Sequence, residues 1–312
     1  VGISDFTKIR EQGYYYVDKT GLISELLEDI AEVTLITRPR RFGKTMGMSM
    51  LANFFDIRKD SKTLFEGLEI SRNTALCETW QNKWPVLFIS FRRVDGLNFQ
   101  SAYEMLQATL TDACENHLYL LESDRISSYQ KEIMDRLLRG TASEKEIKGS
   151  LLLLTRMLRQ HYGKSVILLI DEYDVPIAKA SANGYYPEML EVIKGLMQTL
   201  KDNDALRFAV ITGCLRIAKE SIFTGTNNFV SDTISSSHLN EYFGFTQADV
   251  DQILEDANCQ EHAADIKNWY DGYHFGDLDV YCPWDVMNYL RDLQRNPKAK
   301  PASYWKNTSD NS

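Results

Sequence analysis

The chain has 312 residues, and its 44% hydrophobic and 25% charged residues are the balance of a folded globular protein rather than a disordered one. The formal net charge of −9 opposes contact with nucleic acid, so we expect no direct DNA or RNA binding by this part of the chain. The chain has five cysteines and no C-x-x-C pair, which argues against a disulfide framework and favours reduced thiols in a cytoplasmic protein. It also has no apolar run long enough to span a membrane.

Short aliphatic runs alternate with helical patterns over most of the chain. Runs rich in Val, Ile and Leu predict buried strands, and apolar residues at helical spacing predict helices. The expected elements in chain order are a helix over 21–29, a strand over 33–37, an amphipathic helix through 47–55, a strand over 85–91, helical chain over 98–161, a strand over 165–171, a helix over 188–201 and a strand over 208–212. Strands separated by helices predict an α/β fold with a mostly parallel sheet and flanking helices.

The pattern changes at about residue 237. A helix opened by an N-cap threonine is expected over 246–256, and a shorter helix over 284–292, with aromatic-rich loops between them. We therefore predict a core at 1–237 and a small, mainly helical, lid-like unit at 238–312. The polar end of the chain has no closing element, so we expect the natural protein to continue into a further C-terminal domain.

A glycine, a lysine and a threonine stand where the first strand gives way to a helix. Gly43, Lys44 and Thr45 form the G-K-T end of a phosphate-binding P-loop, and the strand-to-helix setting is the one that a P-loop requires. The unpaired N–H groups and partial positive charge at a helix N-terminus attract phosphate. We expect Lys44 to reach the β- and γ-phosphates of ATP and the Thr45 hydroxyl to bind Mg²⁺.

The preceding loop residues modify this prediction. The general motif G-x-x-x-x-G-K-[ST] has glycine where this chain has Arg38. The positive charges of Arg40 and Arg41 would supplement the phosphate cradle, so we count Arg40, Arg41 and Phe42 with residues 43–45 as cofactor-binding. The alternative is a basic loop between a strand and a helix that binds no ligand.

Two carboxylates end the third predicted strand. Asp171 and Glu172 directly follow five aliphatic residues, which is the arrangement of the strand that partners a P-loop. We expect Asp171 to hold Mg²⁺, directly or through water, and Glu172 to orient and deprotonate the attacking water. The alternative is a strand that ends in polar residues at the surface. An intervening strand at 85–91 points to the P-loop class with an additional catalytic glutamate.

The fourth predicted strand also ends in polar residues. In such ATPases this strand end lies beside the γ-phosphate, so Thr212 is a candidate polar sensor. Arg216 is a candidate catalytic residue that stabilises charge on the transferred phosphoryl group. The alternative for Arg216 is a surface arginine at a turn between strand and helix.

Together these motifs resemble the AAA-ATPase-like family of bacterial and archaeal proteins, distant relatives of the STAND and archaeal-type ATPases. In that family the loop reads R-P-R-R-F-G-K, so Arg38 agrees with the family pattern. The resemblance covers nearly the whole chain through the segments 3–20, 38–45, 169–174, 212–216, 221–228, 242–246, 269–273, 283–284 and 304–305. It implies a P-loop NTPase fold, ATP and Mg²⁺ as cofactors and, in many members, a C-terminal PD-(D/E)xK nuclease-like domain.

The function expected from the residues and the resemblance is Mg²⁺-dependent ATP hydrolysis by one part of a longer protein. Two alternatives stay open. The chain could be a nucleotide-gated switch or scaffold with little turnover, or the ATPase module of a nuclease that processes nucleic acid.

Overall fold

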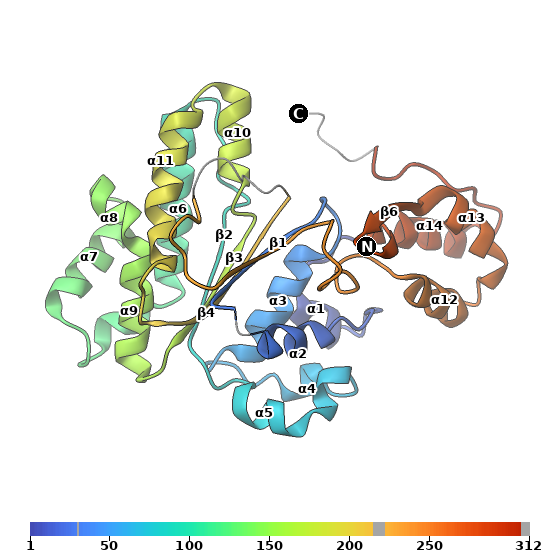
Figure 1. Ribbon diagram of the computed structural model, residues 1–312, viewed down its shortest axis with the longest axis horizontal. Coiled ribbons are helices and arrows are strands. Elements are labelled where there is room, and N and C mark those ends of the chain that lie inside the picture. The colour runs from blue at the N-terminus through green and yellow to red at the C-terminus, as the bar shows by residue number, and fades with distance from the viewer. Residues whose placement is uncertain (30, 215–221, 307–312) are drawn as a thin grey trace.

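The computed structural model describes residues 1–29, 31–214 and 222–306, which form an α/β fold around a parallel sheet (Figure 1). The five strands of this sheet pair in the order β2-β3-β4-β1-β5, and each printed pair is parallel. The strands are β1 Val33–Thr37, β2 Val86–Ser90, β3 Val166–Asp171, β4 Leu206–Gly213 and β5 Phe229–Asp232. This is the P-loop NTPase fold class predicted from the sequence.

Both faces of the sheet are buried, which explains the continuous aliphatic runs. Side chains alternate across a strand, so Leu35 and Leu168 pack on one face while Ile36 and Leu169 pack on the other. All four of these side chains are fully buried. A strand covered on both sides has no polar face, and its sequence therefore reads as an unbroken apolar run.

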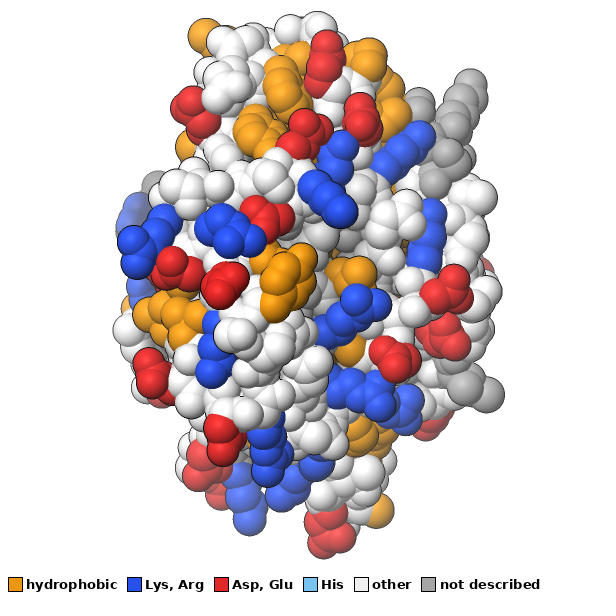
Figure 2. All heavy atoms as spheres, turned by 90° about the vertical axis from the view of Figure 1, so that its left-hand side faces the viewer, with side chains coloured by type: hydrophobic (Ala, Val, Ile, Leu, Met, Phe, Trp, Pro, Cys, Tyr) orange, Lys and Arg blue, Asp and Glu red, His pale blue; other side chains and the backbone are white. Residues whose placement is uncertain are grey.

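Two helical layers cover these faces. On one face lie α6 Phe99–Glu115, α7 Ser128–Arg139, α8 Glu144–Lys148, α9 Ser150–Tyr162, α10 Val175–Asn183 and α11 Tyr186–Met197. On the other lie α1 Phe6–Glu11, α2 Gly21–Glu28, α3 Lys44–Phe55, α4 Lys62–Phe65 and α5 Thr74–Trp80. Short 3₁₀ segments occur at Glu69–Arg72, Leu118–Glu122, Gln198–Leu200 and Gln260–His262. Figure 2 shows acidic and basic side chains interspersed over the outer surface of the α6–α11 layer.

A small unit lies beside the sheet, at the right of Figure 1. It contains α12 Gln247–Asp256, α13 Ala263–Tyr270, an antiparallel hairpin of β6 Asp271–Phe275 and β7 Leu278–Tyr281, and α14 Pro283–Arg295. Its own hydrophobic cluster begins at Phe245, whereas Leu239 and Phe243 pack with the α1–α5 layer. No helix in the described ranges is both long enough and apolar enough to cross a membrane.

The four predicted strands and the predicted helices at 246–256 and 284–292 are confirmed, the former helix with Thr246 as its N-cap. Neither β5 nor the β6–β7 hairpin was predicted from the sequence. Of the four residues of β5 only Asp232 is buried, because this strand lies at the edge of the sheet and lacks an aliphatic run. The hairpin strands are short and carry charged and aromatic residues, so they read as loops.

Candidate nucleotide site

Parallel pairing brings the carboxyl ends of β1, β3 and β4 to one edge of the sheet. Thr37 at the end of β1 lies opposite Gly213 of β4, and Ile170 of β3 lies opposite Ile211. The segments that follow these strands therefore lie side by side, where ligands bind in open α/β sheets. All the motifs predicted from the sequence, as far as the described residues reach, meet at this edge.

The phosphate loop ends at Gly43, the N-cap of α3. Gly43 has φ 85° and ψ 13°, a left-handed conformation that glycine adopts without strain. Among the described residues, no heavy atom beyond its chain neighbours lies within 4 Å of the position that a Cβ would take at Gly43. The loop is therefore open on this side, and the first N–H groups of α3 are available to an anion.

The side chain of Lys44 folds back onto the phosphate loop and bonds to its backbone. Its side-chain ammonium donates to the backbone carbonyls of Arg38 and Pro39, both at 2.8 Å, and lies 3.7 Å from the Cys214 sulfur. Lys44 is buried, with a relative exposure of 5%. The loop itself thus supplies the oxygen partners that fix this charge at the start of α3.

Asp171 is the centre of a hydrogen-bonded group. Its buried carboxylate accepts from the Thr45 hydroxyl at 2.9 Å through Oδ2 and from the Thr212 hydroxyl at 2.6 Å through Oδ1. Thr45 and Asp171 thereby present two hard oxygen donors next to each other. Mg²⁺ is bound through one or two such ligands with waters and phosphate oxygens, so this donor set fits it. Among the described residues no cluster of three or more His, Cys, Asp or Glu could hold a metal ion.

Glu172 follows Asp171 in an unusual backbone conformation. Its φ of 54° is uncommon for a residue other than glycine, and its N–H donates to the Thr212 hydroxyl at 3.4 Å. Burial raises the pKa of the Glu172 carboxyl, and the nearby charge of Asp171 raises it further, while Lys44 and Arg92 act in the opposite direction. A raised pKa suits a carboxylate that accepts a proton.

The side chains of Arg41 and Phe42 are directed to the small unit and not to this edge. The ring of Phe42 is fully buried against Tyr273 and Phe275 of the small unit, at centroid distances of 4.7 and 5.2 Å. The guanidinium of Arg41 stacks on Trp284, 4.0 Å from the ring centroid. Aromatic packing occupies the Phe42 side chain, so a role for its backbone in nucleotide binding stays a prediction. Roles for Arg40 and Arg41 in nucleotide binding stay predictions.

Comparison with known proteins decides the family. The family model described as AAA-ATPase_like, Predicted AAA-ATPase, matches residues 1–223, more than two thirds of the chain. The chain belongs to this AAA-ATPase-like family. The match includes the phosphate loop and the Asp171–Glu172 strand end. Family membership and the fold together identify an ATP-binding P-loop domain.

A curated relative is similar to this chain over nearly its whole length, far beyond the phosphate loop. It is an uncharacterized protein in the vnfD 5′ region of Azotobacter chroococcum mcd 1, and it is 30% identical over 308 residues, covering 98% of this chain. The chain spans 53% of the length of that relative. The similarity therefore extends through β5 and the small unit, which lie beyond the residues matched by the AAA-ATPase-like family model.

The structure explains the arginine at the start of this AAA-ATPase-like loop. Arg38 is fully buried, and its guanidinium is paired with Asp232 at the end of β5. It is therefore an anchor within the protein rather than a phosphate ligand. Asp232 was not among the residues predicted from the sequence. A buried arginine requires an acidic partner, but nothing in the sequence shows which carboxylate provides it.

The predicted catalytic Arg216 falls outside the described residues. Thr212, the other candidate at the end of β4, lies at the site through its bond to Asp171. Gly213 follows it, and a Cβ there would lie 2.6 Å from the Tyr173 ring. A glycine is thus needed where β4 passes the strand end that carries Asp171 and Glu172.

Proposed function

We propose that this domain hydrolyses ATP with Mg²⁺ at the edge formed by β1, β3 and β4. The observation that carries the proposal is the hydrogen-bonded group of Thr45, Asp171 and Thr212 with Glu172 directly beside it. These residues come from three separate segments, and each predicted role requires this proximity. A basic loop without a ligand would not need a buried carboxylate held from both sides.

Each residue has a distinct part in the proposed reaction. The loop amides and Lys44 bind the phosphates, and Thr45 and Asp171 hold Mg²⁺, which neutralises phosphate charge when bound. Glu172 accepts a proton from water as the water oxygen bonds to the γ-phosphorus. The bond from phosphorus to the β–γ bridging oxygen breaks, giving ADP and phosphate. Thr212 keeps the Asp171 carboxylate oriented through its hydroxyl.

Binding of Mg-ATP tests the site. Lys44→Ala removes a charge-assisted contact to phosphate, so we expect affinity for Mg-ATP, measured by titration calorimetry, to fall about 10- to 100-fold. Lys62→Ala, an exposed lysine at the start of α4, is the matched control and should bind as the wild type does. Unchanged affinity in Lys44→Ala would show that ATP does not bind at this loop.

Turnover separates hydrolysis from a nucleotide-gated switch. Glu172→Gln keeps the size of the side chain but cannot take the proton, so we expect turnover to fall about 10²- to 10⁴-fold while Mg-ATP still binds. Near-zero rates in both wild type and Glu172→Gln, with binding retained, would instead favour the switch.

A further inference from the structure

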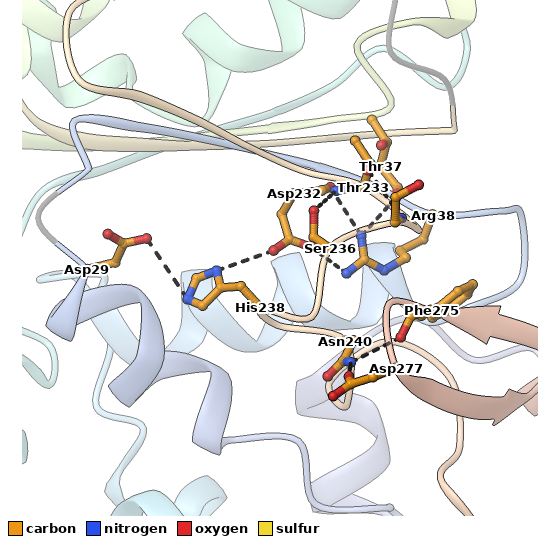
Figure 3. A network of polar contacts seen from close by, with 11 residues as sticks. Asp29, Thr37, Arg38, Asp232, Thr233, Ser236, His238, Asn240, Phe275 and Asp277 are labelled. Atoms are coloured by element: carbon orange, nitrogen blue, oxygen red, sulfur yellow. Dashed lines mark hydrogen bonds and ion pairs between the residues drawn. The ribbon is translucent and has the colours of Figure 1, made fainter.

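The first arginine of the phosphate loop is built into the fold by an unusual set of contacts (Figure 3). The Arg38 Nη1 donates to the Thr37 carbonyl at 2.9 Å and to the Asp232 carbonyl at 3.1 Å, and Nη2 donates to the Asp232 carboxylate. The rings of Phe243 and Phe275 lie 5.6 and 5.3 Å from the guanidinium carbon. One side chain thus joins β1, β5 and the small unit.

The backbone of the same residue reaches the nucleotide site. The Arg38 N–H donates to the Gly213 carbonyl at 3.1 Å, and the Arg38 carbonyl accepts from the Lys44 ammonium at 2.8 Å. Any shift of Arg38 therefore moves one of the oxygens that hold Lys44. Because misplacement of a binding group by about 1 Å can cost up to about 100-fold, the anchorage of Arg38 bears on phosphate binding.

Stability alone does not account for this pair. Burial raises the pKa of Asp232, against the opposing effects of Arg38 and His238, which reflects the cost of removing a carboxylate from water. Buried ion pairs are often no more stabilising than apolar residues of the same volume. Arg38 stands where the general P-loop motif has a glycine, which needs no partner. A role in fixing the position of the phosphate loop would explain why a buried ion pair is present here.

We propose that Asp232 is a positioning residue for ATP binding, which fixes the start of the phosphate loop through Arg38 and thereby sets the position of Lys44. This inference rests on the proposed function. Asp232 does not contact the nucleotide in this proposal and acts only through Arg38. Its loss should weaken ATP binding and leave the rate at saturating ATP close to that of the wild type.

A set of charge-removing variants tests the proposal. Removing one partner, in Arg38→Met or Asp232→Asn, leaves an unpaired buried group, so both variants should unfold at lower urea concentrations than the wild type. The double variant removes both charges and should recover much of that loss. We expect its Kd for Mg-ATP to stay about 10- to 100-fold weaker than that of the wild type, with kcat nearly unchanged. Wild-type affinity in the folded double variant would overturn the proposal.

Arg38→Lys tests the positioning role of Asp232 if the double variant does not fold. Lysine keeps the charge but lacks the planar fork that reaches both the Asp232 carboxylate and the Thr37 carbonyl. We expect a Kd at least about tenfold weaker with a small change in urea midpoint. An unchanged Kd for Arg38→Lys would contradict the positioning role.

A second arginine–carboxylate pair, which is partly exposed, provides a control for removing such a pair far from the nucleotide site. Arg136 of α7 bonds to Glu146 of α8 at 3.1 Å in the opposite helical layer, at the far left of Figure 1. Arg136→Met with Glu146→Gln should leave the Kd for Mg-ATP unchanged, and a matching loss of affinity there would overturn the specific role of Asp232. If the wild type itself bound no Mg-ATP, the proposed function would fail along with this inference. Wild-type binding with an unaffected double variant would refute the inference alone.

Discussion

The two sides of the phosphate loop have different surroundings. On one side the Lys44 ammonium bonds to backbone carbonyls of the loop, and the Thr45 hydroxyl bonds to Asp171 at the end of β3. We call this the strand side. On the other side Arg38, Arg41 and Phe42 meet Asp232 and aromatic residues of the small unit, which we call the anchor side. One short loop therefore carries the residues proposed to bind the nucleotide and the residues that attach the loop to β5 and the small unit.

This difference bears on how the loop is held. The strand side consists of hydrogen bonds between polar groups that a nucleotide can join. The anchor side consists of a buried ion pair, a guanidinium stacked on Trp284 and a fully buried ring, and these contacts attach the loop to the rest of the protein. Variants on the anchor side should therefore change stability and loop position, and variants on the strand side should change binding and turnover.

Phe42→Ala should produce the largest loss of stability on the anchor side. The ring packs between Tyr273 and Phe275, and Gly244 approaches it so closely that a Cβ there would lie 3.0 Å from the ring. Removing a buried phenylalanine ring costs about 3–5 kcal/mol of unfolding free energy, measurable by urea denaturation. Phe42→Leu, which keeps most of the volume, should lose less. A loss below about 1 kcal/mol for Phe42→Ala would show that the ring does not anchor the loop.

Thr212→Val tests whether the strand side depends on its hydroxyl groups. Valine has the shape of threonine but cannot donate to the Asp171 carboxylate, which accepts at 2.6 Å. Hydrogen bonds to charged groups contribute about 1.5–3 kcal/mol, so unfolding free energy should fall by that amount. Thr212→Ser retains the donor and is the control. Equal stability of the valine and serine variants would remove Thr212 from the group around Asp171.

Arg41→Ala and Arg40→Ala compare neighbouring residues of the loop. Arg41 stacks on Trp284, so its loss should cost about 0.5–2 kcal/mol of stability. Arg40 is exposed, so Arg40→Ala should leave stability unchanged and weaken Mg-ATP binding mainly at low ionic strength. If Arg41→Ala weakened binding more than Arg40→Ala without loss of stability, the division of the loop between the two sides would be wrong.

The smallest expected effect concerns the pH dependence of turnover. Glu172 must be deprotonated to act as a base, and its pKa is raised by burial and Asp171 but lowered by Arg92. Removing the positive charge in Arg92→Gln should raise this pKa, so the acid limb of the pH–rate profile should move to higher pH. Arg93→Gln, another exposed arginine, is the control. An acid limb that moves to lower pH in Arg92→Gln would contradict the assigned base.

Much of the strand side could be predicted from sequence because each residue stands at the end of an aliphatic run. Asp171 ends β3 and Glu172 follows it, and Gly43 to Thr45 come directly after β1 and its loop. Parallel pairing then brings these ends together, so local patterns suffice to predict their proximity. The central strands were predictable for the same reason, since burial on both faces leaves continuous apolar runs.

The anchor side could not be predicted because its contacts join residues far apart in the chain. Arg38 and Asp232 are 194 positions apart, and Asp232 ends an edge strand with no aliphatic pattern. Phe42 reads as a loop residue near a ligand, yet the hairpin that buries its ring was itself missed. Sequence motifs report the residue types at a site, whereas tertiary packing decides which way each side chain points.

The central claim is that the two sides of the loop have separable roles, and one paired measurement tests it most directly. Turnover at saturating Mg-ATP and urea unfolding would be measured on Glu172→Gln and Phe42→Ala under conditions where both are folded. We predict that Glu172→Gln loses about 10²- to 10⁴-fold in kcat with equal or greater stability, because a half-buried carboxylate beside Asp171 is removed. Phe42→Ala should lose stability and keep a kcat close to that of the wild type. A Glu172→Gln protein that turns over ATP like the wild type, or that loses as much stability as Phe42→Ala, would contradict the account.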